Sequence, residues 1–534
     1  MTSIEQLPVP PIPPRASTTV LPPSESTASF LITKGNRSYK HQYANIYFIR
    51  LRMLRNFVEA RAHKRWKDIE GSPILVPRVL EVIKSRLCYI VGTVYMDMPL
   101  KPNVMEDIAR DHSIPPPPPS KKFYSSEDNV MLEDESGRIR LVGERLQKAR
   151  LVTGVIIGAL GAETANGDFE VADICYAELA PQDPSNVEEA PIMEDRMDVD
   201  AAQPMDEWIG LISGLDIGSP SPSDAQIQML VEYLSGEEGG VQEQVDAAQI
   251  SRLIIVGNSL AALEPIGRSE SSIENRRPRR YGYDATTFSP HPILNLSAHL
   301  LDIASAMPIH ILPGETDPSG AIMPQQPFPR AMFGAVAKLP TFSCETNPTY
   351  LRFGAGPEFT SEPSNRPSIS RTFLINSGQP LDDMFRYLPS PPNTRLSILE
   401  DTLRWRHMAP TAPDTLWCHP YFSGDPFVIP ETPDLYVIGN QKRFATKMVT
   451  NQDENNGSKR ISCRIIMVPE FSRTGTLVLV NLRSLGVKTV TFVVEGMTGG
   501  GEVVWEPKSP YADSPPLTEP MSTVPRSSLA SETE

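Results

Sequence analysis

One turn in the sequence presents polar side chains directly after a buried strand. The apolar run from Met307 to Leu312 ends at a Pro-Gly pair, and Glu315, Thr316 and Asp317 follow it. A strand that stops at Pro-Gly delivers the next side chains to one edge of a sheet, where α/β folds place their catalytic loops. Carboxylate oxygens at such an edge are potential ligands for a divalent cation. This turn is therefore the first candidate for chemistry.

The turn resembles the Pro-Gly-Asn-His-Asp-Pro segment of calcineurin-like metallophosphoesterases, in which the Asn and His bind metal. Glu315 stands at the Asn position and Thr316 at the His position. Three further stretches resemble the other metal-binding segments of that family, in the same chain order. At their ligand positions stand Gly214 for an Asp, Asp216 for a His, Asn258 for the bridging Asp, and Asn440 and Lys442 for two His. Four such segments across about one domain length indicate a phosphoesterase-like domain.

These residue types do not meet the demands of a two-metal site. Two divalent ions roughly 3.5–4 Å apart need bridging anionic ligands, and borderline metals also favour imidazole. The neutral Asn258 amide bridges poorly, Gly214 has no ligand atom, and Lys442 adds a positive charge. We therefore predict that the fold is kept and the chemistry is lost, with no catalytic, cofactor-binding or metal-ligating residue.

Three carboxylates remain among these positions, at Asp216, Glu315 and Asp317. They could gather one hard cation such as Mg²⁺ or Ca²⁺. They could also cap turns, as acidic side chains often do. We favour turn capping, and both interpretations stay open at this point.

The composition is that of a globular chain with an acidic balance. A length of 534 residues predicts roughly three or four domains. The net charge of −15 argues against broad binding to duplex DNA. The five cysteines lack C-x-x-C spacing, which indicates neither a zinc site nor a disulfide framework. No apolar run approaches ~18 residues, so we predict neither a membrane span nor a secretion signal.

Pro-rich and acidic stretches divide the sequence. Residues 1–30 and 501–534 are rich in Pro and Ser, and we predict that both are disordered tails. Residues 183–206 are predicted to be an acidic linker that self-repulsion keeps extended. The remaining predicted parts are an N-terminal helical segment at 31–70, a β-rich domain at 71–182 and an α/β domain at 207–500.

An amphipathic helix is predicted from Tyr43 to Val58, because apolar residues recur there at helical spacing. Arg50, Arg52 and Arg55 lie between the apolar positions. We interpret this cationic side as a solvated face rather than as a surface for nucleic acid.

Five short strands are predicted next, at 87–96, 130–132, 139–142, 152–160 and 169–176. Five strands in about a hundred residues suit an OB-type barrel. Such barrels often bind single strands through aromatic platforms, and we identify few outward aromatics beyond Tyr89, Tyr95 and Phe169. We therefore favour a protein-binding barrel over a nucleic-acid-binding one.

Helical and buried-strand patterns alternate after Trp208, which is typical of an α/β domain. His407 and His419 are interpreted as structural rather than metal-binding. The predicted helices are 226–234 and 292–306, and the predicted strands are 253–256, 309–312, 461–468, 477–481 and 487–494.

Longer motifs resemble one family, the small (second, B-type) subunits of eukaryotic DNA polymerase delta. The resemblance runs from about Asn36 to Val494. The motifs that carry it are Asn36-Arg37-Ser38-Tyr39, Leu151-Val152-Thr153-Gly154, Pro313 to Gln326, Arg406 to Leu416, Gly424-Asp425-Pro426-Phe427, Val468-Pro469-Glu470-Phe471-Ser472 and Val480 to Leu485.

The resemblance implies an OB-fold barrel packed on an inactivated calcineurin-like phosphoesterase domain, a β-sandwich flanked by helices. It also implies a non-catalytic nuclear scaffold for replication and repair, which joins the Cys-rich C-terminal domain of the catalytic subunit to a third accessory subunit. In some eukaryotes the family looks to be shared with a translesion polymerase, polymerase zeta. An iron–sulfur cluster or zinc would belong to the partner, so we expect no cofactor here and only indirect or weak contact with DNA.

Two other functions are weighed against the scaffold. One is a residually active metal-dependent phosphodiesterase or nuclease, since archaeal relatives of the family keep the metal ligands. The replacements at Gly214, Asn258, Asn440 and Lys442 argue against it. The other is a single-strand-binding OB protein, which the acidic net charge and the few barrel aromatics disfavour.

Overall fold

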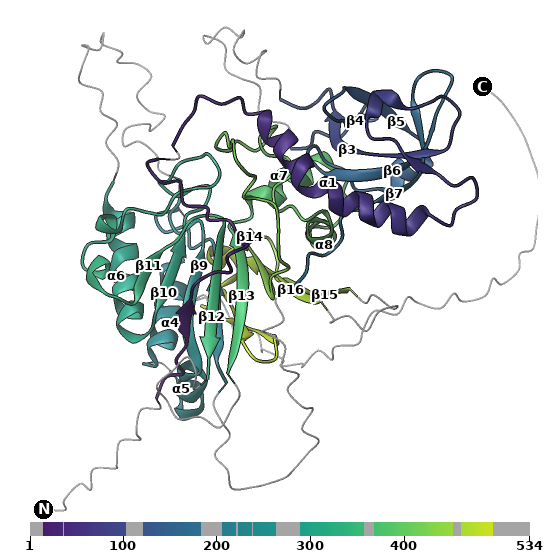
Figure 1. Ribbon diagram of the computed structural model, residues 1–534. Helices are drawn as coiled ribbons and strands as arrows, with labels where there is room; N and C mark the ends of the chain where they lie inside the picture. The colour runs from purple at the N-terminus through teal and green to yellow at the C-terminus, as the bar shows by residue number, and fades with distance from the viewer. Residues whose placement is uncertain are drawn as a thin grey trace, which may run out of the picture. The chain divides into compact units, whose positions relative to one another are not determined.

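The computed structural model describes residues 14–35, 37–102, 121–182, 206–220, 223–237, 239–262, 289–356, 368–451 and 461–494. Three β-sheets and their helices (Figure 1) lie in the compact unit Met1–Val493. Residues 183–205 of the predicted linker and the predicted tail at 501–534 lie outside the described residues. None of the described helices is long and apolar enough to cross a bilayer.

The first sheet closes into a barrel through the additional pairing of β3 with β6. Alternating side chains of β3 face opposite sides, so Ile90 and Val94 fill the interior while Tyr89 and Val91 face outward onto a helix. The five strands predicted here are confirmed, although β6 begins at Ile156 and not at the predicted residue 152. In sheet order the strands are β2 (Ile74–Leu75), β3 (Cys88–Asp97), β4 (Asn129–Glu133), β5 (Arg138–Val142), β7 (Phe169–Cys175) and β6 (Ile156–Glu163).

Helix α1 (Asn45–Trp66) packs against the outside of the barrel and extends eight residues past the predicted end at Val58 (66 − 58). Its Trp66 ring meets Tyr89 edge-on, with ring centroids 5.4 Å apart. The prediction of an outward Phe169 is wrong, because its ring fills the barrel interior. Tyr89 does face outward, but α1 covers it.

The α/β domain stacks two mixed sheets, and side chains such as Val256, Phe353 and Val437 form the core between them. Strands β8 to β11 are mutually parallel, as are β13, β14 and β16. In sheet order one sheet contains β11 (Phe342–Cys344), β10 (Ile309–Leu312), β9 (Ile250–Val256), β8 (Trp208–Ile212), β17 (Thr476–Asn481) and β18 (Val487–Thr491). The other contains β1 (Thr19–Leu21), β12 (Thr349–Ala355), β13 (Ile369–Asn376), β14 (Leu435–Gln441), β16 (Ile461–Pro469) and β15 (Ala445–Asn451).

Helices cover the outer faces of both sheets (Figure 1). Strand β9 is apolar along most of its length because both of its faces are buried, with Ile255 toward α4 and α6 and Ile254 toward the second sheet. The helices and strands predicted in this domain are confirmed. The remaining helices are η1 (Val79–Glu81), α3 (Glu144–Lys148), α4 (Asp224–Ser235), α5 (Val241–Ala248), α6 (His291–Ala306), η4 (Arg330–Phe333), η5 (Val336–Lys338), α7 (Gln379–Tyr387), α8 (Arg395–Trp405) and α9 (Phe471–Thr474).

The prediction of disorder over residues 1–30 is wrong for residues 14–30. Strand β1 pairs with β12, with Val20 opposite Phe353. Phe30 is only 3% exposed and stacks on Tyr350 at 5.7 Å. Pro-rich composition disfavours local structure, but the free edge of a sheet supplies backbone hydrogen bonds that no local pattern reveals.

The solvated interpretation of the cationic side of α1 is wrong for Arg50, whose side chain is fully buried. Its guanidinium donates to the carbonyl oxygens of Gly154, Pro410 and Ala412 at 3.1, 2.7 and 2.8 Å. A buried guanidinium is tolerated only where its donors find acceptors, and the fold provides them. Arg52 is exposed, as the prediction has it.

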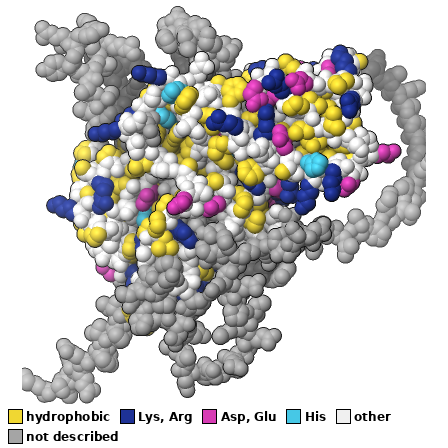
Figure 2. Space-filling view, viewed as in Figure 1, with side chains coloured by type: hydrophobic (Ala, Val, Ile, Leu, Met, Phe, Trp, Pro, Cys, Tyr) yellow, Lys and Arg dark blue, Asp and Glu magenta, His cyan; other side chains and the backbone are white. Residues whose placement is uncertain are grey.

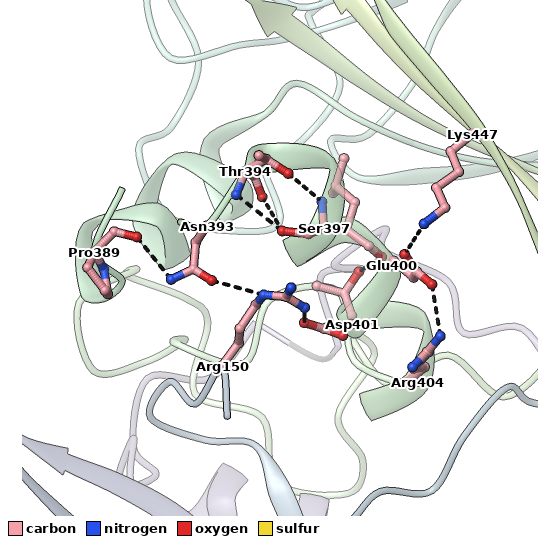
Figure 3. A network of polar contacts seen from close by, with 11 residues as sticks. Arg150, Pro389, Asn393, Thr394, Ser397, Glu400, Asp401, Arg404 and Lys447 are labelled. Atoms are coloured by element: carbon pink, nitrogen blue, oxygen red, sulfur yellow. Dashed lines mark hydrogen bonds and ion pairs between the residues drawn. The ribbon is translucent and has the colours of Figure 1, made fainter. Parts of the chain in front are cut away.

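A second polar contact joins the barrel domain to α8 (Figure 3). Arg150, just before β6, donates from Nε to Asn393 Oδ1 at 2.9 Å and from Nη1 to Asp401 at 2.8 Å. Asn393 in turn donates to the Pro389 carbonyl at 2.9 Å. This network fixes the start of α8 against the loop that enters β6.

Candidate functional site

The candidate positions follow the carboxyl ends of four strands. Gly214 and Asp216 come after β8, Asn258 after β9 and the Glu315–Asp317 turn after β10, all in one sheet. Asn440 lies at the end of β14 in the other sheet. Because β8, β9 and β10 run parallel, their carboxyl ends meet at one edge, as the sequence predicts.

Asn258, at the position of the bridging carboxylate, holds two neighbouring turns together. Its Oδ1 accepts a hydrogen bond from the Thr316 amide at 3.3 Å, and its carbonyl accepts one from the Asp216 amide at 3.2 Å. Its φ of 52° lies in the left-handed region, which Asn tolerates better than most residues. The side chain is therefore part of the local backbone scaffold.

The Pro-Gly turn lies against Asn258 with no space between them. A Cβ added at Gly314 would overlap the amide nitrogen and Oδ1 of Asn258, so only glycine fits there. Thr316, at the His position, donates its hydroxyl to the Leu260 carbonyl at 2.6 Å. The hydroxyl of Thr316 thus ties the Pro-Gly turn to the segment that follows β9.

Asn440 connects the two sheets. Its Nδ2 donates to the Ser377 carbonyl at 2.8 Å and to the Val256 carbonyl at 3.4 Å. Its backbone amide donates to Ser213 Oγ at 2.8 Å. The Asn440 amide nitrogen is thus a donor to backbone carbonyls, while its Oδ1 is buried without a hydrogen-bond partner among the described residues.

Asp317 is a buried turn cap. It is 5% exposed, and its two oxygens accept the amides of Leu260 and Gly314 at 2.9 and 2.8 Å. Burial raises the pKa of Asp317 to about 6, although the backbone hydrogen bonds act in the opposite direction. The turn-capping interpretation is confirmed for this residue.

Asp216 is half-buried and faces α9. Its Oδ2 accepts a hydrogen bond from the Ser472 hydroxyl at 2.9 Å. Burial raises the pKa of Asp216, and the Ser472 hydrogen bond opposes that rise. Its φ of 47° places the residue in a tight turn.

The structure does not bring Glu315 and Lys442 into this cluster. Both side chains are exposed, and within the described ranges neither takes part in a hydrogen bond or ion pair. Across those same ranges, no three His, Cys, Asp or Glu side chains gather closely enough to hold a metal ion.

Sequence reasoning missed a layer of neutral polar side chains beneath the turns. Asn347 is fully buried; its Nδ2 donates to Gln325 Oε1 at 2.7 Å and to Ser377 Oγ at 2.6 Å. Gln325 donates to the Gly314 carbonyl at 2.9 Å. Ser377 directly follows β13, so a polar residue immediately after a buried strand is the signal that could have found it.

The cluster as a whole is a network of amides, hydroxyls and backbone groups with one buried carboxyl, Asp317. Position 214 is a glycine, which has no side-chain ligand atom, and the Asn440 side-chain N–H groups already have backbone acceptors. These residues hold turns in place; they do not supply the bridging anion that two divalent ions need.

One family model matches the barrel, and a second matches much of the α/β part of the chain. The OB-fold domain of the DNA polymerase delta subunit matches residues 42–174, and the B subunit of DNA polymerases alpha and epsilon matches residues 209–446. An OB barrel followed by a phosphoesterase-like domain of this B type defines the class of accessory subunits of replicative DNA polymerases.

Full-length relatives narrow the class further. The chain is 35% identical to the DNA polymerase delta small subunit of Arabidopsis thaliana, over 84% of this chain and 91% of the relative. It is 32% identical to the small subunits of Oryza sativa and of Saccharomyces cerevisiae, over 86% of this chain and 95% and 91% of theirs. The chain belongs to the family of DNA polymerase delta small subunits, which are accessory subunits in DNA replication.

Proposed function

We propose that this chain is a non-catalytic scaffold that joins the Cys-rich C-terminal domain of the polymerase delta catalytic subunit to a third accessory subunit in the nucleus. The observation that carries the proposal is the use made of the former ligand positions. The Asn258 Oδ1, the Thr316 hydroxyl and the Asn440 Nδ2 each form a hydrogen bond with a backbone group. A phosphoesterase-like fold that uses these positions for structural contacts would act by binding partners on its surface rather than through a catalytic site.

The acidic net charge of the chain fits a role in which other subunits of the complex bind the DNA. A net charge of −15 opposes sequence-independent binding to a polyanion, so contact with DNA is indirect or weak. We propose that metal centres of the complex belong to the partner, since the five cysteines of this chain lack C-x-x-C spacing. Sharing of the chain with translesion polymerase zeta is part of the same proposal.

Co-expression with the catalytic subunit's C-terminal domain tests the scaffold. A permanent interface buries more than ~2,000 Å² and is rich in apolar contacts, so the complex should co-elute in size-exclusion chromatography at low and at high salt. Apolar burial is not screened by salt as surface ion pairs are. A monodisperse chain that does not bind the C-terminal domain of the catalytic subunit at micromolar concentration would contradict the proposal.

The loss of catalysis is tested separately. The purified chain should hydrolyse neither a bis-aryl phosphodiester nor single-stranded DNA with Mn²⁺ above the level of the Asn258→Ala variant. Residual phosphodiesterase activity is the alternative. Metal-dependent turnover that disappears in Asp216→Ala would establish that alternative and overturn the proposed catalytic silence.

A further inference from the structure

A groove runs beside α1 that the site described above does not use. It has a volume of about 640 Å³ and lies between the α1 side chains Phe48, Ile49 and Arg52 and the loop residues Phe422 and Ser423. A second hollow of about 430 Å³ continues it past Phe422. Leu31, His41 and Met53 line this hollow. We call the two together the α1 groove.

The α1 groove exposes large apolar side chains. Phe48 is 50% exposed, Met53 38% and Phe422 62%. Phe422 is held in place by stacking on His41, with ring centroids 4.5 Å apart. Hydrophobic side chains and Lys or Arg side chains lie beside one another on the surface over α1 (Figure 2). Exposed apolar side chains gathered along one groove mark an interaction site.

The rim of the groove is cationic although the chain as a whole is acidic. Residues 26–58 contain no Asp or Glu. Arg52 lines the groove, and Lys34, Arg37 and Lys40 are sequence neighbours of lining residues. All four are exposed, and within the described residues none of them forms an ion pair. Arg55, which also lines the groove, is neutralised by Glu135 at 2.9 Å. A partner that covers the groove therefore meets unpaired positive charge on its edges.

The residue types favour a protein over a nucleic acid. Phe, Met and Arg are enriched at the centres of protein interfaces, where Lys is depleted. Here Leu31, Ile49 and Met53 line the groove, while the lysines stand outside the lining. A nucleic acid would instead need a row of stacking rings with cations along the groove itself. A groove that runs alongside a helix suits a second helix packed against it.

We propose that the α1 groove binds an amphipathic helix of another subunit of the complex, with aliphatic or aromatic residues on its buried face and carboxylates along its edges. This inference rests on the proposed scaffold function and assigns it a surface. The aliphatic face fills the space around Phe48 and Phe422, and the carboxylates pair with Arg52 and the lysines of the rim.

The assembled complex gives the first test. Phe422→Asp and Arg52→Glu, made in the full chain, should each weaken binding of one other subunit at least ~10-fold. The matched control is Leu294→Asp, since Leu294 is 60% exposed on α6, away from the groove. If both groove variants bind with wild-type affinity and the complex still forms, the α1 groove is not the binding site. The proposed scaffold function would not be affected by that result.

A synthetic peptide tests the groove without the other subunits. The probe is an amphipathic helix with Leu and Phe on one face and Glu along both edges, and its counterpart carries Lys in place of Glu. The Glu peptide should bind the wild-type chain ~10-fold more tightly than the Lys peptide, and Arg52→Glu should remove that preference. Equal binding of both peptides, or binding that Phe422→Asp does not change, overturns the proposal even if the complex never forms. Preference for a single-stranded oligonucleotide over both peptides also overturns it.

Discussion

Arg50 and Asp425 form a fully buried ion pair that ties α1 to the α/β domain. The guanidinium Nε lies 2.8 Å from Asp425 Oδ2, and neither side chain has any exposed surface. His407 shares the same carboxylate oxygen, with its Nε2 at 2.9 Å. Burial alone would raise the pKa of Asp425, but the charge of Arg50 and these hydrogen bonds hold it far below its ordinary value.

Asp425→Asn should strongly destabilise the fold. It leaves the Arg50 guanidinium buried without a counter-charge, and removing one partner of such a pair costs ~3–5 kcal/mol. Urea unfolding of the full chain measures this loss. The control is Glu81→Gln, which breaks the exposed Arg78–Glu81 pair at 3.6 Å and should cost less than ~1 kcal/mol. Equal losses in the two variants would show that the buried pair does not join the domains.

Gly154→Ala should weaken the same junction from the barrel side. A Cβ there would overlap the Pro410 carbonyl and Arg50 Nη1, and the φ of 91° is strained for any residue with a Cβ. Gly167 has nearly the same φ, 88°, with nothing within 4 Å of its added Cβ. Gly167→Ala should therefore show only the backbone strain of ~1–2 kcal/mol, and Gly154→Ala clearly more. The difference between the denaturant midpoints of the two variants measures the cost of the overlap with Pro410 and Arg50. Equal midpoints would contradict the prediction that this overlap destabilises the fold.

Acidification should destabilise the protein through His407. Burial and the charge of Arg50 lower the pKa of His407 from 6.5 to about 4, despite Asp425 nearby. Between pH 6.5 and about pH 4, His407 is therefore protonated in the unfolded chain but not in the folded chain. The free energy of unfolding consequently falls as the pH drops through this range. Melting temperatures from about pH 7 to about pH 4 should fall less steeply in His407→Gln than in the wild type. Parallel slopes would mean that His407 is not protonated on unfolding.

The N-terminal arm should contribute to stability through Phe30. Its ring is 3% exposed against Tyr350 and Phe427, and Phe30→Ala should cost ~3–5 kcal/mol. The neighbouring Leu31 is 52% exposed, so Leu31→Ala should stay within ~0.5 kcal/mol. Thermal unfolding compares the two, and a silent Phe30→Ala would show that the arm does not dock.

The carboxyl-edge positions could be predicted because they depend on local pattern. A buried strand that stops at Gly or Pro places the next side chain at the sheet edge, which is where Asn258 and Asp317 lie. Which of them is buried could not be predicted in the same way. Glu315 and Asp317 are two positions apart in one turn, yet the first is exposed and the second is enclosed by Leu260 and Gly314.

The sequence by itself determined the periods of the strands and helices and the chemical types at the positions compared with phosphoesterase metal ligands, since both are read from neighbouring residues. The tertiary structure alone decided burial and partnership. Arg50 looks solvated on its helix, and only Asp425, 375 positions away, gives it a counter-charge. No local pattern predicts a strand in the Pro-rich N-terminal arm; β1 forms because the edge strand β12 pairs with it. Such contacts depend on groups far apart in the chain, and no local period encodes them.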